Sequence, residues 1–325
     1  MEPMVSITVS SYKHAKYLPT CLDSLLNQKT NFHYEVVVGE DCSNDGSKEI
    51  LLDYQAKYPD KLVVIFNETN LGVSKNGLNI RKKCRGKYLA SCESDDFWCD
   101  ENKLQKQFDY LEAHPEIAAV GSNNYFVDDD GNNPRLALRK SKTDRVYTLK
   151  DYMRYGFTIH GNTLMRRSET TPSGGEKYEK LRLSVKTQGD IIIRCLIYDK
   201  GGIYVFPEPM LCHRDGSAVA TSYSAQNINN AIKYTYMFED MKNALNEYFE
   251  GKYDFSPIVA NRMAFILFGR IFGNLKFEFK EFFKIYKSLK LSQKLKVVRR
   301  FFAMISDKVC NMVYWRFHDR SQYKG

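Results

Sequence analysis

The sequence predicts an α/β protein in which a mostly parallel central sheet is flanked by helices and followed by a C-terminal helical extension. Two observations support this fold class. Strand-like and helical segments alternate through the first hundred residues, and acidic or polar residues follow each strand-like segment. Such alternation is typical of βαβ units, whose parallel strands are covered by helices on both faces.

The first two strand–helix pairs are short and well delimited. Residues 5–12 form a strand-like run, and residues 15–28 follow with apolar side chains at positions 18, 22, 25 and 26, which is helical spacing. Residues 34–41 form a β-branched run that ends in acids. Residues 48–59 form a second helical segment, which Pro59 closes.

The next segments repeat this order and place polar residues at a common edge. Residues 61–67 predict a third strand, residues 73–84 a third helix and residues 87–93 a fourth strand. The carboxyl ends of parallel strands share one edge of a sheet, where α/β proteins bind their ligands. We therefore expect four polar groups to converge there: Ser10–Tyr12, Glu40 with Asp41, Asn67–Gly72, and Glu93–Asp96.

The rest of the chain is less regular. Residues 116–132 predict a strand and a turn, and residues 133–188 are polar and loop-rich. Residues 189–202 predict a helix that ends at glycines, after which a short strand leads into a polar loop. From about residue 228 the pattern is helical. The predicted domains are a sheet domain at residues 1–225 and a helical region at residues 226–325.

The helical region carries most of the chain's net charge. Residues 251–325 hold 16 Lys and Arg against 5 Asp and Glu, a net charge of +11, so the first 250 residues are near neutral within a total of +9. A basic, aromatic-rich tail of this kind is typical of segments that meet an anionic surface such as membrane lipid. The alternative is a basic helical subdomain that packs on the body or forms a homodimer.

Composition narrows the cellular context. The eight cysteines include no CxxC pair and no zinc-like spacing, so we expect reduced thiols. The N-terminus has no basic segment followed by an apolar one, and the longest charge-free apolar run of the tail, residues 263–269, is too short to cross a bilayer. We expect a cytoplasmic protein, either free or peripheral on the inner face of the cell membrane.

Three acids, Glu93, Asp95 and Asp96, fall within four positions directly after the fourth strand. Like charges this close repel one another unless a positive group lies among them. Surface acids that precede a helix are the alternative, because acids favour helix N-termini.

Five segments, taken in order, resemble a family 2 glycosyltransferase of the GT-A fold, similar to bacterial surface-polysaccharide enzymes. They are VSITVSSYKHAKYLPTCLDSLLNQ, VVVGEDCSNDGSKEIL, NETNLGVSKN, RGKYLASCESDDFW and QGDIIIRCLIYDKGG. The resemblance implies that the acidic segment is a DxD-like motif holding Mn²⁺ or Mg²⁺ on the diphosphate of a nucleotide sugar. It then makes Asp95 the main metal ligand, Asp96 a second or supporting one, and places Glu93 and Ser94 beside the ribose and diphosphate.

The resemblance also assigns the nucleotide site. Asp41 falls where the family uses an acid to bind the nucleobase, most often N3–H of uracil, which favours a UDP-linked donor. Its alternative role is to cap the turn in EDCSNDGS. The other residues expected to line the nucleotide are Ser11, Tyr12, Asn70, Gly72 and Lys75.

Asp190 falls where the family places its general base, at the start of a helix beneath the acceptor site. An inverting transfer needs one base to take the proton of the acceptor hydroxyl. N-capping of the helix is the alternative role of Asp190. His160 lies in a segment that often borders the acceptor, although a lone histidine in a loop also serves structural roles.

The last motif departs from the family pattern. Gly216 occupies the position of an expected metal-binding histidine, and His213 occupies that of a tyrosine. The metal shell could therefore be completed by His213, by Asp215 or by water. Arg214 matches the pattern, and a guanidinium suits diphosphate oxygens.

The predicted function is an inverting, metal-dependent hexosyl- or hexosaminyltransferase that uses a nucleotide sugar and a glycan or polyprenyl-diphosphate-linked acceptor, with no nucleic-acid partner. Two other classes remain open. A sugar-phosphate nucleotidyltransferase would need a glycine-rich loop after the first strand, and SSYKHAKYL has no glycine. A noncatalytic carbohydrate or nucleic-acid binder would leave the acids at the strand ends without a role.

Overall fold

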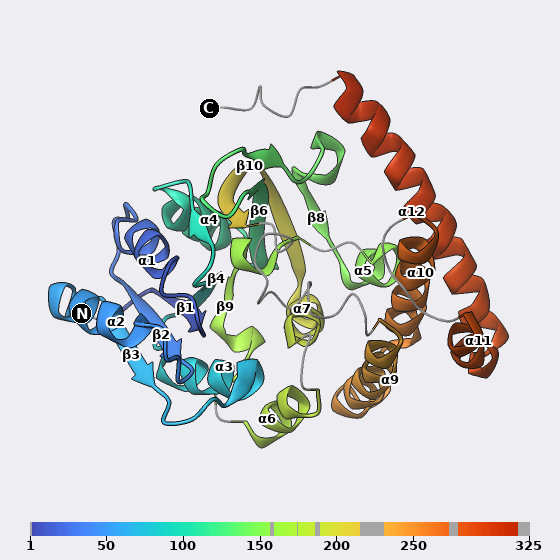
Figure 1. The fold of residues 1–325 in the computed structure, drawn as a ribbon, viewed down its shortest axis with the longest axis horizontal. Helices are drawn as coiled ribbons and strands as arrows, with labels where there is room; N and C mark the ends of the chain where they lie inside the picture. The colour runs from blue at the N-terminus through green and yellow to red at the C-terminus, as the bar shows by residue number, and fades with distance from the viewer. Residues whose placement is uncertain are drawn as a thin grey trace. The chain divides into compact units, whose positions relative to one another are not determined.

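The chain divides into a sheet unit and a helical unit (Figure 1). The structure is a computed structural model that describes residues 2–156, 159–173, 175–185, 189–214, 231–272 and 279–317. The sheet unit comprises Met1–Thr148 and Ile159–Arg214, and the helical unit comprises Leu149–Thr158 and Asp215–Gly325. The boundary predicted at residue 225 lies outside the described residues.

The first four strands form the parallel part of the sheet, as predicted. Their order is β3-β2-β1-β4, and each pair is parallel. The strands are β1 (Val5–Ser11), β2 (Tyr34–Glu40), β3 (Leu62–Phe66) and β4 (Tyr88–Glu93). They alternate with α1 (Leu18–Leu26), α2 (Ser47–Lys57) and α3 (Gly72–Lys83). The βαβ order inferred from the sequence is confirmed.

The second part of the sheet mixes strand directions. Within the described residues the sheet has ten strands, and the order continues from β4 through β9 and β6 to β10 and β5. β9 (Met165–Arg167) is antiparallel to both β4 and β6 (Ile117–Val127), whereas β10 (Gly202–Arg214) is parallel to β6. β5 (Phe97–Trp98), β7 (Arg135–Leu136) and β8 (Arg145–Tyr147) lie at its margins. α4 (Lys103–Ala113) and α7 (Gly189–Lys200) complete the helices that precede β6 and β10.

Two expectations from the sequence underestimated the amount of regular secondary structure. Residues 133–188 were expected to be loop-rich, yet they include β9, which pairs in the middle of the sheet, as well as α5 (Leu149–Tyr155) and α6 (Glu176–Leu183). β9 has only three residues, which are too few to show in the sequence the alternation of apolar and polar side chains that marks a strand. The strand expected after the helix at residues 189–202 was predicted to be short, but β10 has 13 residues. Its two prolines lie where the register against β6 shifts.

The core fixes the end of β2 against α3. Alternate residues of β1 pack with α1 on one face of the sheet: Val5, Ile7 and Val9 are fully buried with Leu18 and Leu22. On the other face, a Cβ added at Gly39 would lie 2.3 Å from Asn76 Oδ1 and 2.7 Å from Ile80 Cγ1. Glycine at this position therefore allows α3 to approach the strand end closely.

The helical unit is built from four helices and α5 in the described residues. The four are α9 (Ala231–Tyr248), α10 (Ser256–Phe272), α11 (Phe279–Ser288) and α12 (Leu291–Phe317). α10 packs against α9, α12 and α5. The helical pattern expected for this part of the chain is confirmed where the structure describes it.

The described residues contain neither a membrane-spanning helix nor a disulfide. No described helix is both long and apolar enough to cross a bilayer. All eight cysteines are free in the structure.

A lysine is fully buried beneath the sheet's carboxyl edge. The Lys103 Nζ donates to Gln107 Oε1 at 2.7 Å and lies 3.9 Å from the ring centre of Trp98. Burial lowers the pKa of Lys103 to about 7. The neutral amine is therefore favoured in the folded protein over a wide range of alkaline pH.

We predict that Lys103→Met removes a pH dependence of stability. An unfolded lysine titrates near 10.5 and the folded one near 7, so the unfolded wild-type chain binds more protons between these values. The free energy of unfolding of the wild type should consequently rise over this interval relative to that of the variant. Urea unfolding of both proteins at several pH values measures the difference, and parallel curves would contradict the assignment.

Candidate active site

Hydrogen bonds join the strand ends at the carboxyl edge of the sheet. The Asp41 N–H donates to Ser11 O at 2.9 Å, and the Ser94 N–H donates to Ser10 O at 3.2 Å. Asn67 Nδ2 donates to Asp41 Oδ1 at 3.0 Å. The four polar groups that the sequence placed at this edge therefore converge, as predicted.

Asp41 caps α3 from the end of β2. Its buried carboxylate accepts hydrogen bonds from Leu71 N at 2.9 Å and Gly72 N at 2.8 Å, in addition to Asn67. Gly72 has a φ of +78°, which confirms the tight turn expected there. The capping alternative is thus realised, but at α3 and not in the turn after β2. A carboxylate has about four acceptor positions, so one remains for a nucleobase N–H.

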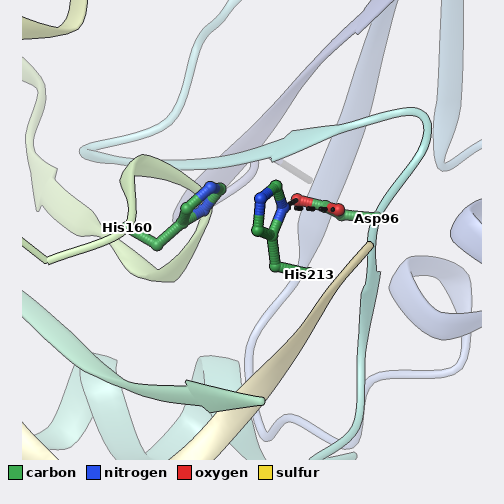
Figure 2. A group of neighbouring side chains, drawn as sticks. All are labelled: Asp96, His160 and His213. Carbon is green, nitrogen blue, oxygen red and sulfur yellow. Dashed lines mark hydrogen bonds and ion pairs between the residues drawn. The ribbon is translucent and has the colours of Figure 1, made fainter. Parts of the chain in front are cut away.

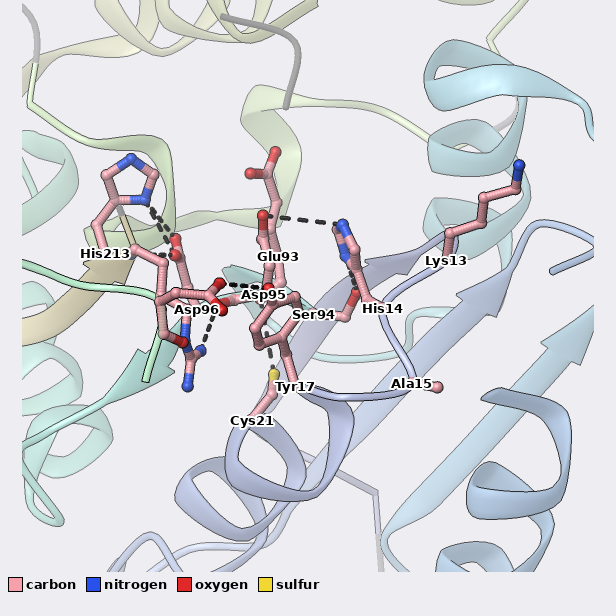
Figure 3. Close-up of polar contacts among 12 residues, drawn as sticks. Lys13, His14, Ala15, Tyr17, Cys21, Glu93, Ser94, Asp95, Asp96 and His213 are labelled. Atoms are coloured by element: carbon pink, nitrogen blue, oxygen red, sulfur yellow. Dashed lines mark hydrogen bonds and ion pairs between the residues drawn. The ribbon is translucent and has the colours of Figure 1, made fainter. Parts of the chain in front are cut away.

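The two aspartates of the acidic motif have different environments (Figure 3). Asp96 is fully buried and accepts hydrogen bonds from Asn162 Nδ2 at 2.6 Å, Arg214 N at 3.0 Å and His213 Nδ1 at 3.0 Å. Burial raises its pKa, but His213 and Asn162 outweigh burial and hold the pKa below its usual value. Asp96 therefore anchors the acidic loop to β10 and to the segment before β9.

Asp95, in contrast to Asp96, has a carboxylate oxygen without a protein hydrogen-bond donor in the described residues. Its Oδ1 is buried and has no hydrogen-bond partner in the described part of the chain, and its Oδ2 lies 3.9 Å from His14 Nε2. Burial and the charge of Asp96 raise the pKa of Asp95. Burial, Asp95 and Asp96 raise the pKa of Glu93 to about 8, although part of the Glu93 side chain reaches the surface.

These carboxylates fit a divalent cation. One oxygen each from Glu93, Asp95 and Asp96 lies within 4.8 Å of the others. A buried carboxylate oxygen without a donor is costly, and concentrated negative charge favours a cation held by oxygen ligands. Because Asp96 is occupied by protein donors, Asp95 is the better ligand of the two aspartates.

Two histidine rings lie next to each other beside Asp96 (Figure 2). The centroids of His160 and His213 are 4.1 Å apart, and the rings are inclined by 35°. Burial and then His213 lower the pKa of His160 to about 4, so this ring is neutral near pH 7. Burial opposes protonation of His213, but Asp96 outweighs it and raises the pKa of His213. With Asp96, these rings form a second group of three potential metal ligands.

Arg214 braces the acidic loop. Its guanidinium donates to the backbone carbonyls of Asp95 and Asp129, and its centre lies 4.8 Å from the ring of Tyr17 and 5.0 Å from that of Phe97. The contact to diphosphate expected for Arg214 remains a prediction. Asp215 and Gly216, which bear on the last metal ligand, lie outside the described residues.

Asp190 pairs with an arginine one helical turn away. Asp190 lies in the first turn of α7 with a half-exposed side chain, and its Oδ2 is 2.5 Å from Arg194 Nη1. Arg194 is buried and also donates from Nη2 to Ile159 O at 3.0 Å. The charge of Asp190 contributes to the raised pKa of Glu93, after burial and the nearer acids Asp95 and Asp96.

The remaining predicted residues are exposed or have no side-chain hydrogen-bond partner in the described residues. Tyr12 is 40% exposed, and Asn70 and Lys75 are exposed, whereas Ser11 is buried with no partner for its Oγ in the described residues. Sequence reasoning missed three polar residues of the site: His14, Asn162 and Arg194. Only Arg194 has a readable signal, its i,i+4 spacing from Asp190 on a predicted helix.

The sheet topology and the acidic loop at its carboxyl edge define a GT-A glycosyltransferase fold. The sequence model of glycosyl transferase family 2 matches residues 6–170, just over half of the chain. The chain therefore belongs to glycosyl transferase family 2.

Individual relatives match shorter stretches. An uncharacterised protein of Mycobacterium tuberculosis is 41% identical over 127 residues, which cover 39% of this chain and 37% of that protein. The putative teichuronic acid biosynthesis glycosyltransferase TuaG of Bacillus subtilis is 32% identical over 110 residues, which cover 34% of this chain and 42% of TuaG. The chain thus spans less than half the length of these relatives.

Among solved structures, the chain is similar to S. aureus TarS in complex with UDP-GlcNAc. The TM-score is 0.57 with 18% sequence identity, over 92% of this chain and 79% of that chain. At this identity the likeness supports the fold.

We predict opposite effects of one substitution at neighbouring positions. Asp96→Asn should lower the free energy of unfolding by about 3 kcal/mol or more, because it removes a buried charge from its donors. Asp95→Asn should leave the stability of the metal-free protein unchanged or slightly higher, because it removes a like charge. Urea unfolding without divalent metal measures both, and equal losses would contradict the division between anchor and ligand.

Proposed function

We propose that the protein is an inverting, metal-dependent glycosyltransferase that moves a hexosyl or hexosaminyl group from a UDP-linked sugar to an acceptor hydroxyl. The acceptor is a glycan or a polyprenyl-diphosphate-linked saccharide of surface-polysaccharide synthesis. The observation that carries the proposal is the pair of buried polar atoms without partners, Asp95 Oδ1 and Ser11 Oγ, at the carboxyl edge of the sheet. The names of TuaG and of the TarS complex support a sugar-nucleotide chemistry.

The nucleotide would lie across the ends of β1, β2 and β4. Asp41 retains one acceptor position for uracil N3–H, and the exposed ring of Tyr12 is suited to stack on a base. Ser11 Oγ would donate to the nucleotide, and Glu93 would accept from a ribose hydroxyl. Of these groups, Ser11 Oγ is buried without a partner in the described residues, so a donor nucleotide would satisfy it.

Asp95 and Glu93 would hold the divalent metal, Mn²⁺ or Mg²⁺, which supplies positive charge to the leaving diphosphate. Asp96 keeps Asp95 in place by anchoring the loop, and Arg214 holds the Asp95 carbonyl from the other side. These protein contacts fix the loop before any ligand arrives, which lowers the cost of ordering it on binding.

Asp190 would act as the base. Arg194 engages its Oδ2, which leaves Oδ1 to accept the proton of the acceptor hydroxyl as that oxygen attacks the anomeric carbon. Attack opposite to the leaving diphosphate inverts the anomeric configuration. Arg194 also holds the Ile159 carbonyl next to His160, so one buried guanidinium positions both the base and the segment expected to border the acceptor.

We predict that Asp190→Asn binds UDP as well as the wild type and loses sugar transfer by about 10² to 10⁴ in rate. Asparagine keeps an oxygen that can accept the hydrogen bond from Arg194, and the side chain at this position is half exposed, so the melting temperature should change little. Product analysis by NMR should show inversion for the wild type. Normal transfer by the variant would remove Asp190 from the mechanism, and retention of configuration would exclude a single-base inversion.

We further propose that α12 places the protein on an anionic phospholipid surface at the inner face of the membrane. Its exposed apolar residues are spaced by three, four or seven positions, which places them on one helical face: Leu291, Leu295, Val298, Phe302, Val309 and Met312. Residues 279–317 contain ten Lys and Arg against two Asp and Glu. Two copies of so basic a segment would repel, whereas acidic lipid complements it.

We predict that the double substitution Leu295→Ser with Phe302→Ser reduces cosedimentation with phosphatidylglycerol vesicles. Both side chains are 62% exposed, so the fold should tolerate the change. Leu52→Ser, at a 46% exposed position of α2, is the control and should bind as the wild type. Raised salt should also weaken binding. Unchanged lipid binding together with a changed oligomeric state would identify α12 as a dimer surface instead.

A further inference from the structure

We propose that His14 is a nitrogen ligand of the divalent metal and gives this protein a preference for Mn²⁺ over Mg²⁺. The inference rests on the metal-dependent function proposed above. It assigns a role to a residue of the β1–α1 loop that no motif of the sequence singled out. The observations are the position of the His14 ring between Ser94 and Asp95 and the open oxygen of Asp95 (Figure 3).

The His14 ring is oriented by a fixed partner. Its Nδ1 lies 2.8 Å from the Oγ of Ser94, a fully buried residue whose N–H is bound to Ser10 O. In the tautomer whose Nδ1–H donates to this hydroxyl, Nε2 carries a lone pair. Histidines that bind metals are held in the same way, by a hydrogen bond from the second ring nitrogen.

The free nitrogen faces the carboxylate that fits a metal. His14 Nε2 is 3.9 Å from Asp95 Oδ2, which is too far for a direct hydrogen bond. Two ligands that are each about 2.1 Å from one ion can lie up to about 4.2 Å apart, so a single cation can bridge this gap. The side chains of His14 and Asp95 are 19% and 18% exposed, which leaves the position accessible to a ligand from solvent.

The donor type then decides between metals. Mg²⁺ takes oxygen ligands and keeps its waters, whereas first-row transition ions accept imidazole nitrogen. A site of carboxylate oxygens alone would discriminate less between Mn²⁺ and Mg²⁺, because both ions accept oxygen ligands. One imidazole among the ligands should favour Mn²⁺.

His213 is the competing nitrogen ligand, since its Nε2 is left over when Nδ1 is bound to Asp96. Its Nδ1 contacts a carboxylate that already has two other donors, so the His213 ring is part of the anchor of the loop. His14 instead faces Asp95, whose Oδ1 has no partner in the described residues. The geometry therefore favours His14.

The test is pulsed electron paramagnetic resonance of Mn²⁺ bound to the full-length protein with UDP. Nitrogen coordinated to Mn²⁺ modulates the spin echo, and ¹⁵N-histidine labelling changes that modulation. We expect a ¹⁴N signal in the wild type that disappears in His14→Ala and His14→Gln. It should persist in His213→Ala and in His114→Ala, where His114 is a control histidine that also faces a carboxylate, Glu116, at 3.2 Å.

Affinity provides the second readout. In the presence of UDP, His14→Ala should bind Mn²⁺ about tenfold or more weakly, and Mg²⁺ nearly as well as the wild type. A signal that survives in His14→Ala, or unchanged Mn²⁺ affinity in both His14 variants, overturns the inference. Asp95→Asn separates it from the proposed function. If Asp95→Asn binds Mn²⁺ as the wild type does, the metal site itself is wrong; if only His14 is without effect, the metal site stands.

Discussion

The buried carboxylate of Asp96 is the contact on which the site depends. It accepts hydrogen bonds from Asn162, from His213 and from the backbone of Arg214, and so joins the loop after β4 to two segments distant in sequence. A buried charge is tolerated only when several donors satisfy it. Asp95 directly precedes this anchor in the chain, and its Oδ1 is buried without a hydrogen-bond partner in the described residues.

The electrostatics of the site follow from this anchor. Asp96 keeps its charge because its partners are donors, whereas Glu93 and Asp95 have raised pKa values because burial and neighbouring acids oppose their ionisation. Carboxyl groups with shifted pKa values of this kind are typical of functional sites. At the start of α7, Asp190 pairs with the buried guanidinium of Arg194. Under the proposed function the carboxylates would have separate roles: Asp96 anchors the loop, Glu93 and Asp95 would attract a cation, and Asp190 would accept a proton.

Much of this could be read from the sequence, and the limits are physical. Periodicity was sufficient for the parallel half of the sheet, and the polar residues at the strand ends were sufficient for their convergence at one edge, because these signals are local. The roles of Asp41, Asp95 and Asp190 came from the family resemblance and stay predictions. β9 is a three-residue strand held by partners on both sides, so no local pattern reveals it. The sequence also did not show that Asp96 is bound by protein donors while Asp95 Oδ1 is not. This difference depends on Asn162, which lies 66 positions from Asp96.

The proposed function requires that the carboxyl edge of the sheet binds a uridine nucleotide together with a divalent metal. Thermal unfolding with a panel of nucleoside diphosphates, each with and without Mn²⁺, tests it most directly, because a ligand that binds the folded state raises the melting temperature. We expect UDP to raise the melting temperature more than CDP or GDP, and we expect the full effect to require Mn²⁺. No shift with any nucleotide, or the same shift with and without Mn²⁺, would contradict it.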